Sequence, residues 1–274
     1  MPRSIWKGAV SFGMVSIPIK LYTATESKDV SFNLLHSKCH TRIKQQRYCP
    51  TDDEVVEWGD VVRGYEYGPD RYVIMEDSDF ERVPVASAHT VEIVQFVELD
   101  QVDPIHYDRS YYLEPDPVGV KPFALLRETL RRTGRVAVAK VSLRQKQQLC
   151  ILRPYDNALA LETMYYPDEI RSTAEMALPG EEVEVSDREM DMAQSLVDML
   201  TGDFDPSQYR DEYRLALLEV IEKKAAGQEI ARPAPVAGKV TDLMEALRAS
   251  IEVAKKERAT AEEAPRAAAR RAAG

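Results

Sequence analysis

The periodicity of apolar residues changes along this chain, and the change restricts the folds that the chain can adopt. Up to about residue 170, apolar residues recur at alternate positions in short runs, which is typical of β-strands with one buried face. From residue 186 onward they recur every three or four positions, which is typical of amphipathic helices. A chain of 274 residues can bury a core of useful size. The sequence therefore predicts a β-rich domain followed by a helical part.

Turns and one helix divide the β-rich part. Residues 5–35 alternate with a change of parity at Gly13, which indicates a bend, and residues 36–60 are polar and predict an exposed loop or hairpin. The sequence Pro154-Tyr155-Asp156-Asn157 is typical of a tight turn and predicts a hairpin. Residues 121–133 predict an amphipathic helix that ends at Gly134. The other strand candidates are 71–75, 90–99, 105–113, 136–143, 148–153 and 158–166. Many strands and one inserted helix predict an α+β fold, mainly β, built on a β-barrel.

Three helices are expected after the barrel. Ser186 and Glu189 form a capping box for a helix that Gly202 closes, and Asp205-Pro206 predicts the start of a second helix that ends at Gly227. Residues 231–238 contain two prolines and predict a linker. A third helix is expected at 241–258, and the Ala/Arg/Glu-rich residues 259–274 predict a disordered tail.

The charge distribution is more informative than its sum. The net charge of −10 argues against nucleic acid as a partner. Residues 1–50 and 121–153 nevertheless carry net charges of +6 and +8, whereas residues 51–120 and 154–274 carry −14 and −10. Because a local potential attracts a polyanion, this pattern predicts one positive face on an otherwise acidic protein.

Most catalytic motifs are absent from the sequence. No Gly-x-Gly fingerprint occurs, and the Walker-like spacing of Gly8 and Gly13 continues with Met14-Val15 in place of Lys-Ser/Thr. Three cysteines do not make a disulfide framework, and no apolar run is long enough for a signal peptide or a membrane helix, so a cytoplasmic protein is expected.

Two clusters could hold a metal ion. Asp52-Asp53-Glu54 could bind Mg²⁺ in a nuclease, although acidic residues are also common in turns. Cys39, His40 and Cys49 could supply part of a zinc site, but free thiols are the favoured interpretation because further ligands are missing nearby. We therefore expect no metal and no cofactor.

Several runs, in order along the chain, closely resemble the bacterial Ku family. They are WKGAVSFGMVSIPIKLY at 6–22, GVKPFALLR at 119–127, LCILRP at 149–154, LETMYY at 161–166 and DLMEAL at 242–247. The resemblance implies a Ku-type β-barrel core with a DNA-encircling bridge and a helical C-terminal arm that embraces a second subunit. Related sequences often have a cysteine two positions after Cys49-Pro50, where this chain has Asp52, so no metal site is carried over.

The resemblance implies a non-enzymatic function. Such proteins are homodimeric rings that thread onto the ends of double-stranded DNA without reading sequence and recruit an ATP-dependent DNA ligase for non-homologous end joining. It implies three parts: barrel core and bridge at 1–185, dimer arm at 186–230, and linker, ligase-docking helix and basic tail at 231–274. A nucleoid-associated place in the cytoplasm is expected.

Site residues follow from combining the resemblance with the basic segments. The residues expected to contact DNA phosphates are Lys38, Arg42, Lys44, Arg47, Arg131, Arg132, Arg135, Lys140, Arg144 and Lys146. The residues expected to dock the ligase are Leu243, Met244, Leu247 and Ile251, which form one stripe of the third helix. A carboxylate-dependent nuclease is the alternative function, and a single-strand binder is a third, although residues 127–146 contain none of the aromatic residues that such binders use.

Overall fold

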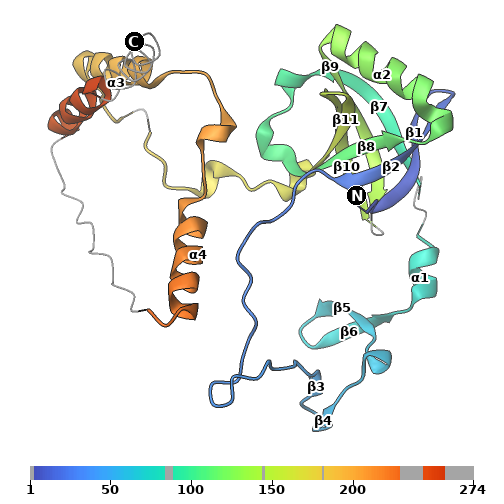
Figure 1. The fold of residues 1–274 in the computed structure, drawn as a ribbon. Helices are drawn as coiled ribbons and strands as arrows, with labels where there is room; N and C mark the ends of the chain where they lie inside the picture. Colours follow the sequence, from blue (N-terminus) through green and yellow to red (C-terminus); the bar gives the residue numbers. More distant parts are fainter. Residues whose placement is uncertain (1–2, 84–88, 144–145, 181, 229–242, 257–274) are drawn as a thin grey trace, which may run out of the picture. The chain divides into compact units, whose positions relative to one another are not determined.

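The computed structural model describes residues 3–83, 89–143, 146–180, 182–228 and 243–256 (Figure 1). Chain contacts divide the protein into two compact units, residues 1–174 and 175–274. Linker 231–238, the tail at 259–274 and Arg144 lie outside the described residues. In the part of the chain that is described, no helix has the length and apolar character needed to cross a bilayer.

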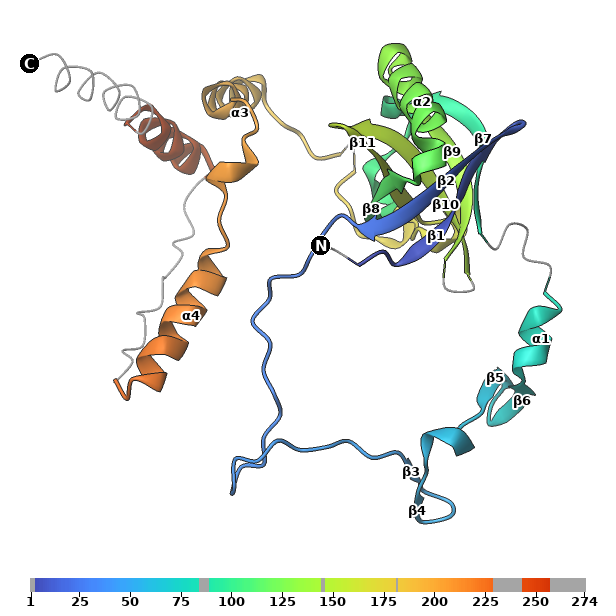
Figure 2. The same ribbon diagram turned by 45° about the vertical axis from the view of Figure 1, so that its right-hand side comes forward.

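The first unit is built on a closed seven-stranded barrel, which confirms the predicted β-barrel core (Figure 2). The strand order is β1-β2-β8-β11-β10-β9-β7, and β7 closes the barrel by pairing with β1 in parallel. All the other neighbouring strands pair antiparallel. The barrel strands are β1 (Trp6–Phe12), β2 (Val15–Thr23), β7 (Thr90–Glu98), β8 (Tyr107–Pro115), β9 (Arg135–Leu143), β10 (Lys146–Tyr155) and β11 (Ala158–Met164).

Alternating side chains fill the barrel. Val10, Ile17, Leu21, Leu152 and Leu161 are fully buried in one continuous core. Helix α2 (Val120–Thr133) adds three buried apolar residues to that core and ends at Gly134 as predicted; Gly134 has a left-handed φ of 67°. The hairpin β10–β11 is also confirmed, with Asp156 at φ 44° in its turn. The predicted α+β fold, mainly β, is therefore confirmed.

The two ends of the barrel differ. We call the end where β8 finishes and β9 begins the helix end, because α2 joins these strands there and lies over it (Figure 1). We call the opposite end, where β9 finishes and β10 begins, the open end. The long insertion at 24–89 leaves the barrel after β2 and returns to it before β7, and both connections are at the open end.

Within the insertion, residues 24–83 contain no buried residue. The prediction of β-structure up to residue 35 is wrong beyond Thr23, because polar side chains there bond locally: the Ser27 hydroxyl donates to Asp29 (2.7 Å). Strand β5 was not predicted, since its two glycines lower strand propensity. The elements of the insertion are β3 (Tyr48–Cys49), β4 (Glu54–Val55), β5 (Arg63–Gly68), β6 (Arg71–Met75) and α1 (Asp77–Glu81).

The second unit is helical. Helix α3 (Asp187–Leu200) begins with the predicted capping box, in which the Ser186 hydroxyl accepts from the amide of Glu189. The prediction that Asp205-Pro206 opens a continuous second helix is wrong: a 3-10 turn covers Pro206–Gln208, Tyr209 is extended, and α4 (Glu212–Ala225) begins after the cap Asp211. The Asp211 carboxylate accepts from the amide of Arg214 (2.9 Å), which restarts the helix there.

The third predicted helix is present in its described part, residues 243–256. Leu243 of the expected docking stripe is exposed, and Met244, Leu247 and Ile251 are half-buried. Ala254 is buried, and a cavity of about 430 Å³ lies between this helix and α3. The helix therefore lies against α3 within the second unit.

Candidate nucleic-acid interface

The last part of the first basic segment folds into a tight loop in the insertion. Leu35 and Arg42 form a β-bridge, the His36 amide donates to the Thr41 carbonyl (2.9 Å), and His40 adopts a left-handed φ of 54°. We define the basic loop as residues 35–47, which carry Lys38, Arg42, Lys44 and Arg47. These local backbone bonds shape the loop without a hydrophobic core, so its cationic side chains lie on an exposed backbone.

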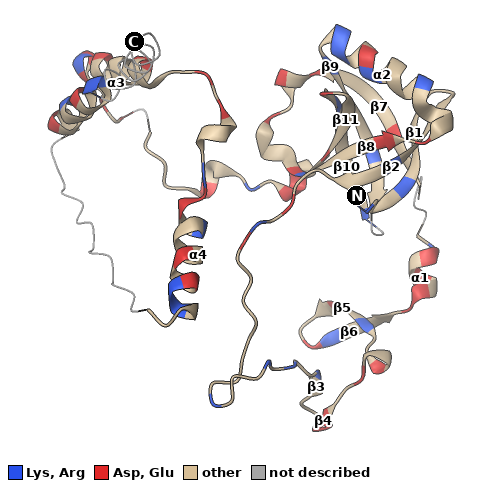
Figure 3. Cartoon of the chain, in the orientation of Figure 1, with Lys and Arg blue, Asp and Glu red and all other residues tan. Residues whose placement is uncertain are grey.

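The cations of the basic loop form no ion pair with the acids that the structure describes. No acidic residue occurs between Asp29 and Asp52. Within the described part of the chain, Lys38, Arg42 and Lys44 form no ion pair with a carboxylate. Figure 3 shows basic positions along the trace before β3 and acidic ones on α1. Free cations of this kind are suited to neutralise phosphates.

Arg47 differs from the other loop cations. Its guanidinium lies over the ring of Trp58, 4.0 Å from the centroid. A cation–π contact fixes the plane of the guanidinium and leaves its edge N–H groups available to an anion.

The second basic segment is distributed along the barrel, and acidic residues from elsewhere lie beside it. At the helix end, the guanidinium of Arg132 donates to Glu128 (2.9 Å), and this bond lowers the pKa of the Glu128 carboxyl. Arg131 pairs with the same carboxylate (3.8 Å) and also donates to the backbone carbonyl of Asp156. Arg131 therefore holds α2 against the β10–β11 turn, whereas Arg132 pairs within α2.

Three further cations of the second segment also lie beside acids. Arg135 and Lys140 lie directly opposite Glu98 and Glu92 in the register of β9 and β7. Lys146 donates to Glu169 (2.8 Å), which raises the pKa of the lysine and lowers the pKa of the glutamate. The fold thus places Arg131, Arg132 and Arg135 at the helix end and Lys146 at the open end.

The open end carries two cations that the sequence did not single out. Arg3 and Arg109 line a cavity there together with Lys146. Arg109 lies within an acidic stretch of sequence, and Arg3 lies near the beginning of the chain. Only closure of the barrel brings them together, so no local sequence signal could have identified them.

The two candidate metal clusters make internal contacts. His36 Nδ1 and Cys39 Sγ are 3.1 Å apart, and Cys49 Sγ donates to Asp52 Oδ2 (3.1 Å). The Tyr48 hydroxyl donates to Asp53, which occupies a turn with φ 58°. Among the described residues, no group of three or more histidine, cysteine or acidic side chains is arranged to hold a metal ion.

Comparison with known proteins identifies the family. The family model described as "Ku70/Ku80 beta-barrel domain" matches residues 11–192. The chain is 50% identical over 261 residues to the Non-homologous end joining protein Ku of Symbiobacterium thermophilum, covering 94% of this chain and 64% of that protein. It is 48% identical to the same-named protein of Heliobacterium modesticaldum, covering 92% of each chain.

A third relative supports the same assignment. The Non-homologous end joining protein Ku of Bacillus subtilis is 42% identical over 254 residues, which cover 91% of this chain and 82% of the relative. The chain therefore belongs to the Ku family of bacterial non-homologous end joining proteins.

Proposed function

We propose that this chain binds the ends of double-stranded DNA without reading their sequence, as a homodimeric ring that recruits an ATP-dependent DNA ligase. The names of the relatives support a role in end joining, and the proposed function requires no chemical step. The observation that carries the proposal is the basic loop, an exposed segment whose lysines and Arg42 form no ion pair with a described acid, in an insertion whose described residues 24–83 include no buried one.

Sequence-independent binding follows from the type of contact. Lysine and arginine bind phosphate oxygens, which are the same for every base pair. Lys38, Arg42, Lys44 and Arg47 are the main contacts in this proposal. Cations that already have acidic neighbours contribute less, because binding phosphate must compete with the existing pair. Those weaker candidates are Arg131, Arg132, Arg135, Lys140 and Lys146; Arg144, which lies outside the described residues, is a further proposed contact.

The homodimer is supported by the state of the arm helices. Neither α3 nor α4 contains a buried residue, although both carry large apolar side chains. Phe204 and Tyr213 are 80% and 77% exposed. An apolar surface of this kind in the 186–230 arm is suited to covering by a second subunit.

Ligase recruitment is assigned to the helix at 243–256. An amphipathic helix can dock through residues at positions i, i+4 and i+8, and Leu243, Leu247 and Ile251 have this spacing, with Met244 beside them. The exposed Leu243 would be the first contact.

End selectivity in this proposal comes from topology, because a closed protein ring can be threaded onto a free DNA end but not onto covalently closed DNA. The test is binding to one plasmid in linear and covalently closed form, at equal base-pair concentration, moderate salt and with Mg²⁺ present. Strong preference for the linear form without cutting is expected. Equal binding to both forms would exclude the threading ring, and nicking of the circle would favour a nuclease at Asp52-Asp53-Glu54.

A further inference from the structure

A cavity of about 710 Å³ lies at the open end of the barrel. Its walls come from the start of β1, β8 and β10 and from the end of β9, together with the residues before β1. This volume is in the range of roughly 300–1,000 Å³ that is common for small-molecule sites. The phosphate-contact candidates described above leave the cavity unexplained, except for Lys146 at its rim.

The lining combines cations with an apolar floor. Arg3, Arg109 and Lys146 supply positive charge, and Asp108 is the acid in the lining. Glu169 neutralises Lys146 from outside the lining, so these five groups carry one net positive charge.

The floor contains Trp6, Tyr111 and Leu143. The indole of Trp6 packs over Gly8, where a Cβ atom would clash with it, so the ring is held in place. An aromatic floor below a cationic rim is suited to a ligand that has both a flat apolar part and an anionic part.

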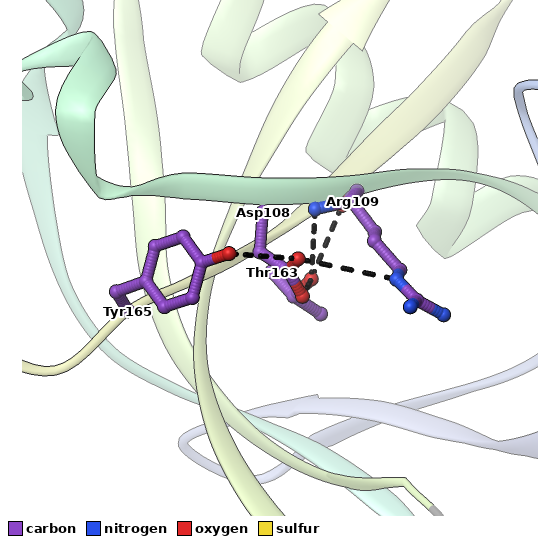
Figure 4. A network of polar contacts seen from close by, with 4 residues as sticks. All are labelled: Asp108, Arg109, Thr163 and Tyr165. Atoms are coloured by element: carbon purple, nitrogen blue, oxygen red, sulfur yellow. Dashed lines mark hydrogen bonds and ion pairs between the residues drawn. The ribbon is translucent and has the colours of Figure 1, made fainter. Parts of the chain in front are cut away.

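A network of hydrogen bonds fixes the polar wall (Figure 4). Thr163, which is 1% exposed, has its hydroxyl 3.3 Å from Asp108 Oδ2 and accepts from the Arg109 amide (3.1 Å). The Tyr165 hydroxyl donates to the other Asp108 oxygen (3.4 Å). The Asp108 carboxylate is thereby held by two side chains of the strand β11 region, and the backbone of Arg109 is fixed beside it.

The Arg109 guanidinium has fewer fixed partners within the protein than the Arg109 backbone has. Its closest acidic partner is Asp108, with Nε 3.9 Å from Oδ1, which is longer than a hydrogen bond, and the side chain is 63% exposed. In Figure 4 the guanidinium extends away from Tyr165. A guanidinium presents five N–H donors in a planar fork that matches a phosphate, so most donors of Arg109 are available to a ligand.

We propose that this cavity binds a nucleoside monophosphate unit, with its phosphomonoester on Arg109 and Arg3 and its base on the apolar floor. A phosphomonoester carries about −1.5 to −2 charges at neutral pH, which complements the excess positive charge of the lining. The unit can belong to an unpaired 5′-phosphorylated nucleotide at a broken DNA end or to a free nucleotide.

The DNA source rests on the proposed function. The Ala24 amide, at the start of the insertion, donates to the Ser110 carbonyl (3.0 Å), and Ser110 lies between Arg109 and Tyr111 in sequence. The insertion that carries the basic loop therefore leaves the barrel beside the cavity. A duplex held by that loop can present its terminal nucleotide to this end of the barrel.

The first experiment measures binding of free ligands to the full-length protein by isothermal titration calorimetry. Deoxyadenosine monophosphate should bind, and deoxyadenosine should bind at least tenfold more weakly. Arg109→Gln and, independently, Arg3→Gln should each weaken monophosphate binding at least tenfold, because each removes a phosphate donor. Arg82→Gln after α1 is the matched control, since it removes an exposed arginine outside the cavity and should leave monophosphate binding unchanged. Absence of monophosphate binding, or equal binding by both cavity variants and wild type, overturns the site.

The second experiment identifies the source and separates this inference from the proposed function. It compares a blunt duplex with the same duplex carrying a 5′-phosphorylated four-nucleotide overhang. If the DNA end is the source, wild type binds the overhang more tightly and Arg109→Gln loses that increment while binding the blunt duplex normally. Monophosphate binding without an increment assigns the cavity to a free nucleotide. If the protein binds the monophosphate but neither duplex, the cavity site stands and the proposed function is refuted. If it binds both duplexes equally and does not bind the monophosphate, the proposed function stands and the cavity site is refuted.

Discussion

Replacing Lys38, Arg42 and Lys44 together by glutamine tests whether the basic loop supplies the electrostatic part of DNA binding. None of the three has a carboxylate partner among the described residues, so each can neutralise one phosphate. Each such contact contributes about −0.9 to the slope of log K against log salt concentration. The triple variant should therefore lower the magnitude of the slope by about 2.7 for each subunit that engages the DNA. Between 50 and 200 mM salt, that difference is about 40-fold in affinity.

The assay is fluorescence anisotropy of a labelled blunt duplex at five salt concentrations. Arg131→Gln with Arg132→Gln is the matched control, because both arginines already pair with Glu128 and should change the slope by less than one contact each. Arg47 is left in place so that its contact with Trp58 is preserved. A triple variant with the wild-type slope, or a control variant with the larger loss, refutes the distinction between free and paired cations.

Three further changes test the core, the basic loop and the arm. Leu161→Ala should reduce the free energy of unfolding by about 3 to 5 kcal/mol in urea titrations, because this fully buried side chain leaves a cavity; a loss below 1 kcal/mol would contradict the assigned core. Thr41 and the His36 ring lower the pKa of the Cys39 thiol to about 7, so its alkylation rate should rise with a midpoint near pH 7, and Thr41→Val should shift that midpoint upward. Phe204→Ser with Tyr213→Ser should convert the proposed dimer to a monomer in sedimentation while each chain stays folded, since both side chains are exposed; a variant that still sediments as a dimer would exclude the arm interface.

Local sequence signals predicted the elements whose causes are local. The β10–β11 hairpin follows from a turn sequence, the start of α3 follows from the Ser186 capping box, and the end of α2 follows from Gly134. The start of α4 was mispredicted because Asp205 and Asp211, which lie within seven residues, are both helix N-caps. The prediction began the helix after Asp205, whereas the continuous helix begins after Asp211. Strand β5 could have been found from the Pro69-Asp70 turn that follows it, since Asp70 has a φ of 55°.

The electrostatic environment of the candidate site could not be predicted in this way. A run of basic residues in the sequence does not reveal which acids the fold brings beside it. Glu98 and Glu92 lie opposite Arg135 and Lys140 only because β7 pairs with β9 in this register. Glu169 reaches Lys146 from beyond β11. The two basic segments look alike in sequence, but the fold places acids beside several cations of the second and leaves Lys38, Arg42 and Lys44 of the basic loop without an ion pair among the described residues.

This difference reconciles a net charge of −10 with a polyanionic partner. The acids that make the chain negative are concentrated after residue 51, and several of them lie beside cations of the second basic segment. The basic loop lies in the stretch between Asp29 and Asp52 that contains no acid at all. Because screening at physiological salt limits exposed charges to about 8 Å, a phosphate beside that loop responds mainly to its local cations. The sum over the chain therefore has little bearing on binding at the loop, and the distribution of charge decides it.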